Sequence, residues 1–194
     1  STGNFVSRPA NFTVSNVRRT ADNVANPGTT TASGTVFLAA GRPFGATVTA
    51  VDAEGATTPN YGREASPESV RFTTTLVLPA TGAAPAVTGT FGAFTSGQAS
   101  GTAFSWNEVG TMRLVPRVSD GDYLAAGDVV GSASAPVGRF VPDRFEIAQN
   151  TPVFQTSCIA GGYGYVGQPF VYTVAPVITA TAVAFGGSTT TNYT

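Results

Sequence analysis

Residues 49–61 read TAVDAEGATTPNY, and residues 181–193 read TAVAFGGSTTTNY. Three matched pairs of blocks in one order indicate an internal repeat, and this repeat decides the architecture of the chain. The sequence therefore predicts a first module over residues 1–139 and the opening part of a second, repeat-related module over residues 140–194. The two earlier pairs of blocks are GRPF (41–44) with GQPF (167–170), and RPANFTV (8–14) with VPDRFEI (141–147).

Short runs of β-branched and apolar residues, bounded by Gly and Pro, favour strands throughout. The clearest run is 70–78, where alternate side chains would share one face. The segment 137–147 would carry the chain from one module into the next. We therefore predict an all-β fold of tandem immunoglobulin-like antiparallel β-sandwich modules, the second of them incomplete. The other strands that we expect are 12–17, 35–38, 44–52, 87–94, 102–104 and 111–118.

A sandwich that lacks half of its strands exposes apolar surface and open edges, so the incomplete second module needs an explanation. In one explanation, the 194 residues are a fragment of a longer protein. In the other, a neighbouring chain or a missing segment completes the module, as in strand donation between the subunits of a fibre.

The composition excludes several classes of function. Charged residues make up 11% of the chain, and the net charge of −1 argues against a surface that binds nucleic acid or anionic membranes. The chain contains no histidine, which excludes histidine-based catalytic triads and metal sites. A pair of carboxylates such as Glu64 with Glu68 or Glu108 would suffice for a glycosidase, but nothing in the sequence places such a pair in a cleft. We therefore predict that the protein is not an enzyme and needs no cofactor.

Cys158 is the single cysteine, so no disulfide can form within these 194 residues. Three interpretations remain for it: a buried thiol, a disulfide partner outside the chain, or a reactive thiol.

Six blocks of the sequence are informative in combination: AGRPF, NEVG, SDGDYL, VGRFVPDRF, TAVDAxGxT followed by NYGRE, and Cys158 separated by six residues from YVGQPF. Together these motifs resemble the large C-terminal region of MshQ-like proteins, and the resemblance covers residues 8–194. That family is associated with the mannose-sensitive haemagglutinin type IV pilus of Gram-negative bacteria. The resemblance implies an extracellular, cell-surface protein with pilus components among its partners, and it supplies no catalytic residues to transfer.

Two functions agree with these features. The first is a non-catalytic structural module of a pilus-associated exported protein, which includes the option of a fibre-forming subunit. The second is an adhesin module that binds glycan or another surface ligand through loops such as 80–86 or 120–128. In either case the partners would include other modules of the same protein or neighbouring subunits.

Asp120, Asp122 and Asp128 form an acidic turn near the end of the first module. Carboxylate oxygens at a module boundary are ligands that Ca²⁺ accepts, although the spacing is not that of an EF-hand. The alternative is a solvated turn whose carboxylates bind nearby backbone amides. Trp106 would be a core residue or a platform for a sugar ring.

The repeated Asn60-Tyr61 and Asn192-Tyr193 pairs predict a structural corner. There, the Asn side chain would stabilise a turn and the Tyr would pack with its hydroxyl bonded to the backbone. The alternative is a ligand contact that recurs in each module. For the junction between the modules, we expect contacts by Arg139, Phe140, Val141 and Phe145.

Overall fold

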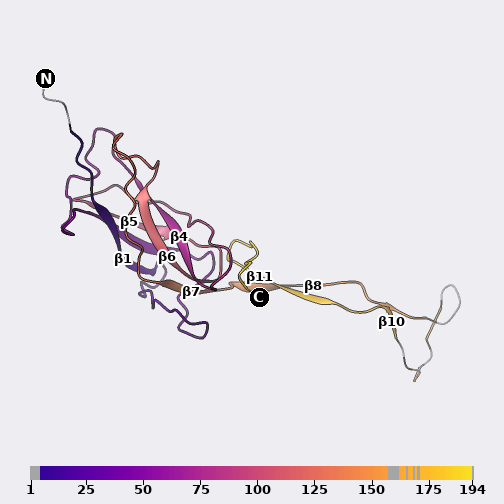
Figure 1. Ribbon diagram of the computed structural model, residues 1–194. Helices are drawn as coiled ribbons and strands as arrows, with labels where there is room; N and C mark the ends of the chain where they lie inside the picture. The colour runs from indigo at the N-terminus through magenta and orange to yellow at the C-terminus, as the bar shows by residue number, and fades with distance from the viewer. Residues whose placement is uncertain (1–4, 157–161, 165, 168, 170, 194) are drawn as a thin grey trace.

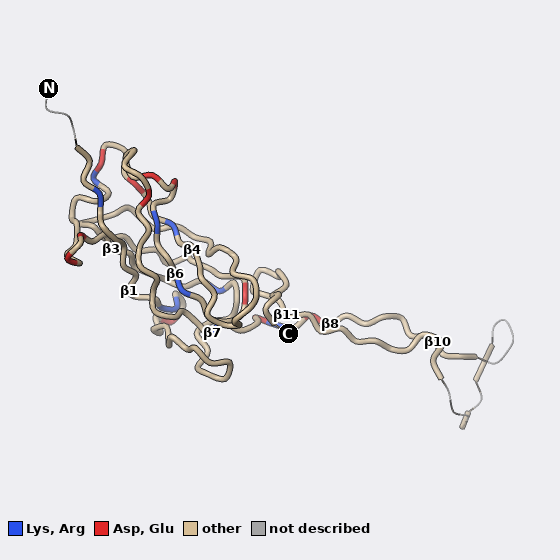
Figure 2. Tube along the Cα trace, viewed as in Figure 1, with Lys and Arg blue, Asp and Glu red and all other residues tan. Residues whose placement is uncertain are grey.

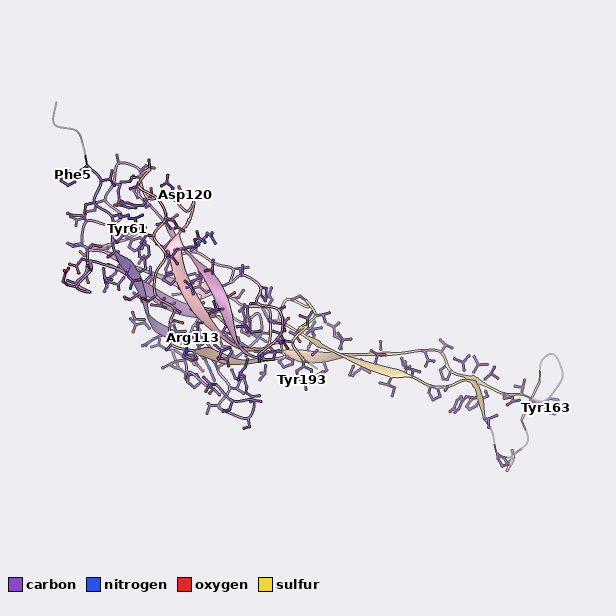
Figure 3. The ribbon with its side chains drawn as sticks, viewed as in Figure 1. Phe5, Tyr61, Arg113, Asp120, Tyr163 and Tyr193 are labelled. Carbon is purple, nitrogen blue, oxygen red and sulfur yellow. The ribbon has the colours of Figure 1, made fainter. Side chains whose placement is uncertain are left out.

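The computed structural model describes residues 5–156, 162–164, 166–167, 169 and 171–193. It has a β-sandwich at one end, from which a narrow two-stranded arm projects (Figure 1). The chain folds back along this arm, so that residue 193 lies where the arm meets the sandwich (Figure 3). The predicted all-β class is confirmed: the described residues form strands and turns and no helix.

One sheet of the sandwich is antiparallel and has the order β1-β3-β5. It consists of β1 (Asn11–Arg19), β3 (Phe44–Val51) and β5 (Gln98–Phe104). The central strand β3 is almost wholly buried.

The second sheet has the order β2-β7-β6-β4. It consists of β2 (Leu38–Ala39), β4 (Val70–Leu78), β6 (Gly110–Val118) and β7 (Val137–Val141). Its pairs are antiparallel except for β2 with β7, which is parallel. Because β6 and β7 pair within this sheet, the first module uses the chain up to residue 141.

The core between the two sheets is rich in aromatic side chains. Trp106 is fully buried and contacts the ring of Phe140 at 5.2 Å between centroids, while its Nε1 donates to the Pro85 carbonyl at 3.0 Å. The core interpretation of Trp106 is therefore confirmed. The other large side chains of this cluster are Phe37, Phe44, Phe72, Phe104, Met112 and Leu114.

Beyond the sandwich, β8 (Arg144–Gln149) pairs antiparallel with β11 (Ile178–Val183). Farther along the arm, β9 (Val153–Phe154) pairs with β10 (Tyr172–Val174). These strands are the described part of the predicted second module. Cys158 lies outside the described residues.

One predicted strand is absent from the structure. Residues 87–94 do not form a strand, and a single bridge joins Thr88 to Ser105. Their Pro and Gly neighbours limit regular pairing there. The segment 137–147 carries the chain from the sandwich into the arm, as predicted. It does so as two strands, β7 and β8, because Pro142 lies between them and lacks the N–H that a ladder needs.

No helix among the described residues has the length and hydrophobicity to cross a membrane.

Tyr61 and Tyr123 stack on each other in the core of the sandwich. Their buried hydroxyl groups should make the stability of the protein sensitive to alkaline pH. Burial, followed by the nearby Glu64 carboxylate, raises the pKa of Tyr61 well above its ordinary value. Burial and a hydrogen bond to Glu64 likewise raise the pKa of Tyr123. The unfolded chain therefore loses these protons first, at a pH of about 10, and stability falls as the pH rises above that value.

We expect the urea midpoint to be constant from neutral pH to about pH 9 and to fall above pH 10. Tyr61→Phe should reduce this fall, because it removes one of the two buried phenols. Tyr193→Phe is the matched control, since Tyr193 is 51% exposed. If the urea midpoint fell equally above pH 10 in Tyr61→Phe and in the unsubstituted protein, the Tyr61 hydroxyl would not be a cause of the alkaline destabilisation.

Candidate functional site: the module junction

The site that the fold assembles is the contact between the sandwich and the base of the arm, which we call the module junction. Only two residues, 142 and 143, separate the end of β7 from the start of β8. On the sandwich side, the junction consists of Ala40, Gly41, Arg42, Ala83, Glu108 and Val109. On the arm side it consists of Asp143, Ala184, Phe185, Thr191 and Asn192.

Glu108 is the centre of this junction. It lies between β5 and β6 and is 3% exposed. One carboxylate oxygen accepts hydrogen bonds from the backbone N–H and the hydroxyl of Thr191, both at 2.8 Å. The other accepts from the N–H of Asn192 at 3.0 Å and of Val109 at 2.9 Å. A buried carboxylate is stable only when its oxygens accept several hydrogen bonds, and here the second module supplies three of the four donors.

Asn192 makes the reciprocal contact with the sandwich. Its side-chain amide donates to the Ala83 carbonyl at 2.8 Å and accepts from the Ala83 N–H at 2.7 Å. The same amide lies 3.3 Å from the Val109 carbonyl. Two hydrogen bonds between the Asn192 side-chain amide and the Ala83 backbone therefore hold the loop that contains Ala83 against the second module.

Apolar and charged contacts complete the junction. Ala40, Val109 and Ala184 form a small buried cluster, and the Phe185 N–H donates to the Ala40 carbonyl at 2.9 Å. The Arg42 guanidinium lies 3.8 Å from the centre of the Phe185 ring, in cation–π geometry.

Arg42 also pairs with Asp143 at 3.0 Å; the Asp143 side chain is 13% exposed, whereas that of Arg42 is 45% exposed. This pair is partly screened by solvent and adds less than the buried contacts.

Gly41 permits the close approach of the two modules. Its φ of +81° lies in the left-handed region of backbone conformation, which residues other than glycine rarely adopt. A Cβ at this position would lie 3.0 Å from the Phe185 backbone nitrogen. The glycine of the repeated GRPF block is therefore required both by backbone conformation and by packing.

The first copy of the repeated turn is not built for the same contact. Asp52 stands where the second copy has Ala184, and its carboxylate accepts from the N–H groups of Glu54 and Ala56 within the turn. Pro59 stands where the second copy has Thr191, so it has neither the N–H nor the hydroxyl that Glu108 binds. The two turns share a backbone shape but differ in what they can bind.

The residues predicted for the junction were largely wrong. Phe140 is 1% exposed in the sandwich core, and Arg139 donates to the Gly34 carbonyl of the same module at 3.2 Å. Val141 pairs with Ala39 within the sandwich sheet. Phe145 lies on the arm and is 49% exposed. The prediction followed proximity in sequence, whereas the contacts come from segments distant in sequence.

The repeated corners were also only partly as predicted. Tyr61 packs against the rings of Phe12, Phe94 and Tyr123, but its buried hydroxyl has no hydrogen-bond partner among the residues that the structure describes. The Asn192 side chain binds the other module instead of its own turn. Figure 3 places Tyr61 in the sandwich and Tyr193 at the base of the arm. Sequence reasoning identified these positions as structural and missed the contact with Glu108.

The structure does not bring the three predicted calcium ligands together. Asp128 pairs with Arg117, Asp122 accepts from the Gly127 N–H at 2.7 Å, and Asp120 accepts from the Asp122 N–H at 3.0 Å. Each carboxylate thus stabilises its own turn or ion pair. Within the part of the chain that the structure describes, no group of three acidic or cysteine side chains is placed to hold a metal ion.

We therefore expect millimolar Ca²⁺ to leave the melting temperature of the protein unchanged. Asp128→Asn should lower the melting temperature equally with and without Ca²⁺, because it removes the ion pair with Arg117. Thermal unfolding measured in the presence of Ca²⁺ and in the presence of a chelator tests this. A rise in melting temperature with Ca²⁺ that Asp128→Asn abolishes would restore the calcium hypothesis.

The carboxylates considered for acid–base chemistry have other contacts. Glu64 accepts from the Tyr123 hydroxyl at 2.7 Å, Glu68 lies 3.4 Å from the Leu124 N–H, and Glu108 belongs to the junction.

The distribution of charge is uneven along the molecule: residues 147–194 contain no Asp, Glu, Lys or Arg, so the arm is uncharged beyond Glu146 (Figure 2).

Comparison with protein families divides the chain into two parts. Residues 8–105, just over half of the chain, match the model of DUF6701, second domain, and residues 108–194 match that of DUF6701, third domain. The boundary between the two matches falls next to Glu108 and between β5 and β6, whereas in the structure β6 pairs with β4 of the first sandwich. No curated protein and no solved structure gave a significant match. The chain therefore belongs to the DUF6701 family, of which it contains the second and third domains in succession.

Proposed function

We propose that this chain is a non-catalytic structural part of an exported bacterial surface protein, in which consecutive β-modules are joined rigidly end to end. The observation that carries this proposal is the burial of Glu108 between the modules, with three of its four donors on the second module. Domains of one chain usually move relative to each other unless their interface is extensive or specific. A connection of two residues and a buried carboxylate oppose such movement here.

A location on the cell surface in association with type IV pilus components is the finer part of the proposal. Its support is the set of motifs that resemble those of MshQ-like proteins, together with a sequence poor in charged residues and rich in Ser and Thr. Other modules of the same protein and pilus components are the proposed partners. The protein would act mechanically, by holding successive modules in a fixed orientation as they project from the cell.

Two measurements test the proposal at different levels. Immunogold electron microscopy with antibodies against residues 1–194 should label the surface of the source bacterium, with pre-immune serum as the control; label confined to the cytoplasm would overturn the location. Residual dipolar couplings should give one orientation for the β4–β6 pair relative to the β8–β11 pair. Independent alignment of the two pairs would overturn the rigid connection.

An adhesin is the second candidate, and one observation favours it. A groove of about 420 Å³ lies at the end of the sandwich remote from the arm and is lined by Ser7, Arg8, Asp52, Asn60 and Tyr123, among others. Polar side chains beside aromatic rings are typical of small-molecule sites of this size. The 80–86 loop, in contrast, is bound to Asn192. Binding of labelled chain to a glycan array, abolished by Asn60→Ala, would support an adhesin in place of a purely structural module.

A further inference from the structure

The β8–β11 pair reproduces the register of the β1–β3 pair over five successive residue pairs, from Arg144 opposite Val183 to Ala148 opposite Thr179. Phe145 lies opposite Ala182 as Phe12 lies opposite Ala50. The ring contact recurs as well: Phe145 and Tyr193 have centroids 5.3 Å apart at 69°, and Phe12 and Tyr61 have centroids 5.2 Å apart at 76°. The β8–β11 pair at the base of the arm is therefore a second copy of the β1–β3 pair.

The two copies differ in what covers them. Phe12 and Tyr61 are 0% and 3% exposed, whereas Phe145 and Tyr193 are 49% and 51% exposed. In the first module, Phe94 and Tyr123 cover Tyr61, with ring centroids 4.6 Å and 5.7 Å away. Phe145 and Tyr193 thus have the mutual geometry of core side chains but are exposed to solvent on the arm. This exposure is unfavourable, because apolar surface that could be buried remains in contact with water.

The two copies also differ at one strand edge. In the first module, β5 pairs with β3 and places Ala99 opposite Val48, and the Ala50 N–H donates to the Gly97 carbonyl at 2.9 Å. The strand β11 pairs with β8 alone among the described residues, so its other edge is open there. Natural proteins commonly protect open edges with charged residues, yet residues 147–194 contain none.

We infer that the open edge of β11 is a binding site for an antiparallel strand of the β5 type, which carries a small residue opposite Ala180 and an aromatic ring onto Tyr193. This inference rests on the proposed function, because it takes the arm to be part of a tandem module.

The small residues follow from packing. In β5, Ala99 lies opposite Val48 and is 3% exposed. Two residues farther on, a Cβ on Gly101 would lie 2.7 Å from the Phe104 ring, so larger side chains on this strand would displace the core. The aromatic residue of the bound strand would contact Tyr193 as Phe94 contacts Tyr61 in the first module. Phe94 lies four residues before the start of β5.

The test adds this strand to the full chain. A copy of residues 94–106 is joined after Thr194 by a flexible Gly/Ser linker, which holds it near β11 at an effective concentration of the order of millimolar. Hydrogen exchange is then followed by NMR at the N–H of Ala180 and Ala182, which correspond to Val48 and Ala50. We expect exchange at Ala180 to slow about tenfold or more relative to the unextended chain, while β4 and β6 are unchanged.

The matched control carries A99P and G101P in the appended copy alone, because proline removes the N–H groups that a ladder needs. This control should exchange as fast as the unextended chain. No slowing with the appended strand, or equal slowing with the proline control, would overturn the inference.

Two further outcomes are decisive. If the unextended chain already protects Ala180 and is a dimer by light scattering, the occupant is β11 of a second copy and the inference is wrong. If the appended strand fails while Thr191 and Asn192 remain protected at the junction, this inference falls and the proposed rigid connection stands.

Discussion

Phe140→Ala is expected to lower the free energy of unfolding by about 3–5 kcal/mol, the range for removing a fully buried aromatic side chain. Phe140 is 1% exposed and contacts the rings of Phe37, Phe44 and Trp106. Truncation would leave a cavity among aromatic rings that cannot collapse without shifting both sheets. Denaturant unfolding followed by Trp106 fluorescence measures the effect.

Phe145→Ala is the matched control, since it removes the same atoms from a side chain that is 49% exposed on the arm. We expect the unfolding of the sandwich to change by less than about 0.5 kcal/mol in this variant. Comparable losses in the two variants would mean that the arm and the sandwich unfold as one unit and that Phe145 is buried in solution.

Glu108→Gln should release the second module's turn without unfolding the sandwich. Glutamine has nearly the same shape, but its NH₂ group replaces one of the two acceptor oxygens that bind four donors. Each buried N–H that loses its acceptor costs about 1–3 kcal/mol. We therefore expect hydrogen exchange at Thr191 and Asn192 to speed up roughly tenfold to a hundredfold.

Glu54→Gln is the control for the loss of one negative charge, because Glu54 is exposed in the first copy of the same turn. It should leave exchange at Thr191 and Asn192 unchanged. Equal exchange at these two residues in Glu108→Gln and the unsubstituted protein would show that the buried carboxylate does not connect the modules, and the rigid connection would then lose its main support.

The periodic patterns of the chain were sufficient for most of the fold. The alternation in 70–78 predicted β4 with the observed bounds, and the repeat predicted that the second module would begin as the first does. Alternation of side chains and turn residues is a local property, so single segments report it directly. Residues 87–94 were predicted as a strand and are not one, because pairing partners and Pro or Gly neighbours decide such weak segments.

The amino-acid sequence by itself determined the all-β class and the internal repeat, since both follow from residue types and their spacing along the chain. Only the tertiary structure decided the junction. Glu108 binds Thr191 and Asn192 across more than eighty residues of sequence, and Asn192 reaches Ala83 across more than a hundred. No local pattern encodes such pairs, because a buried carboxylate finds its donors only when two folded segments meet.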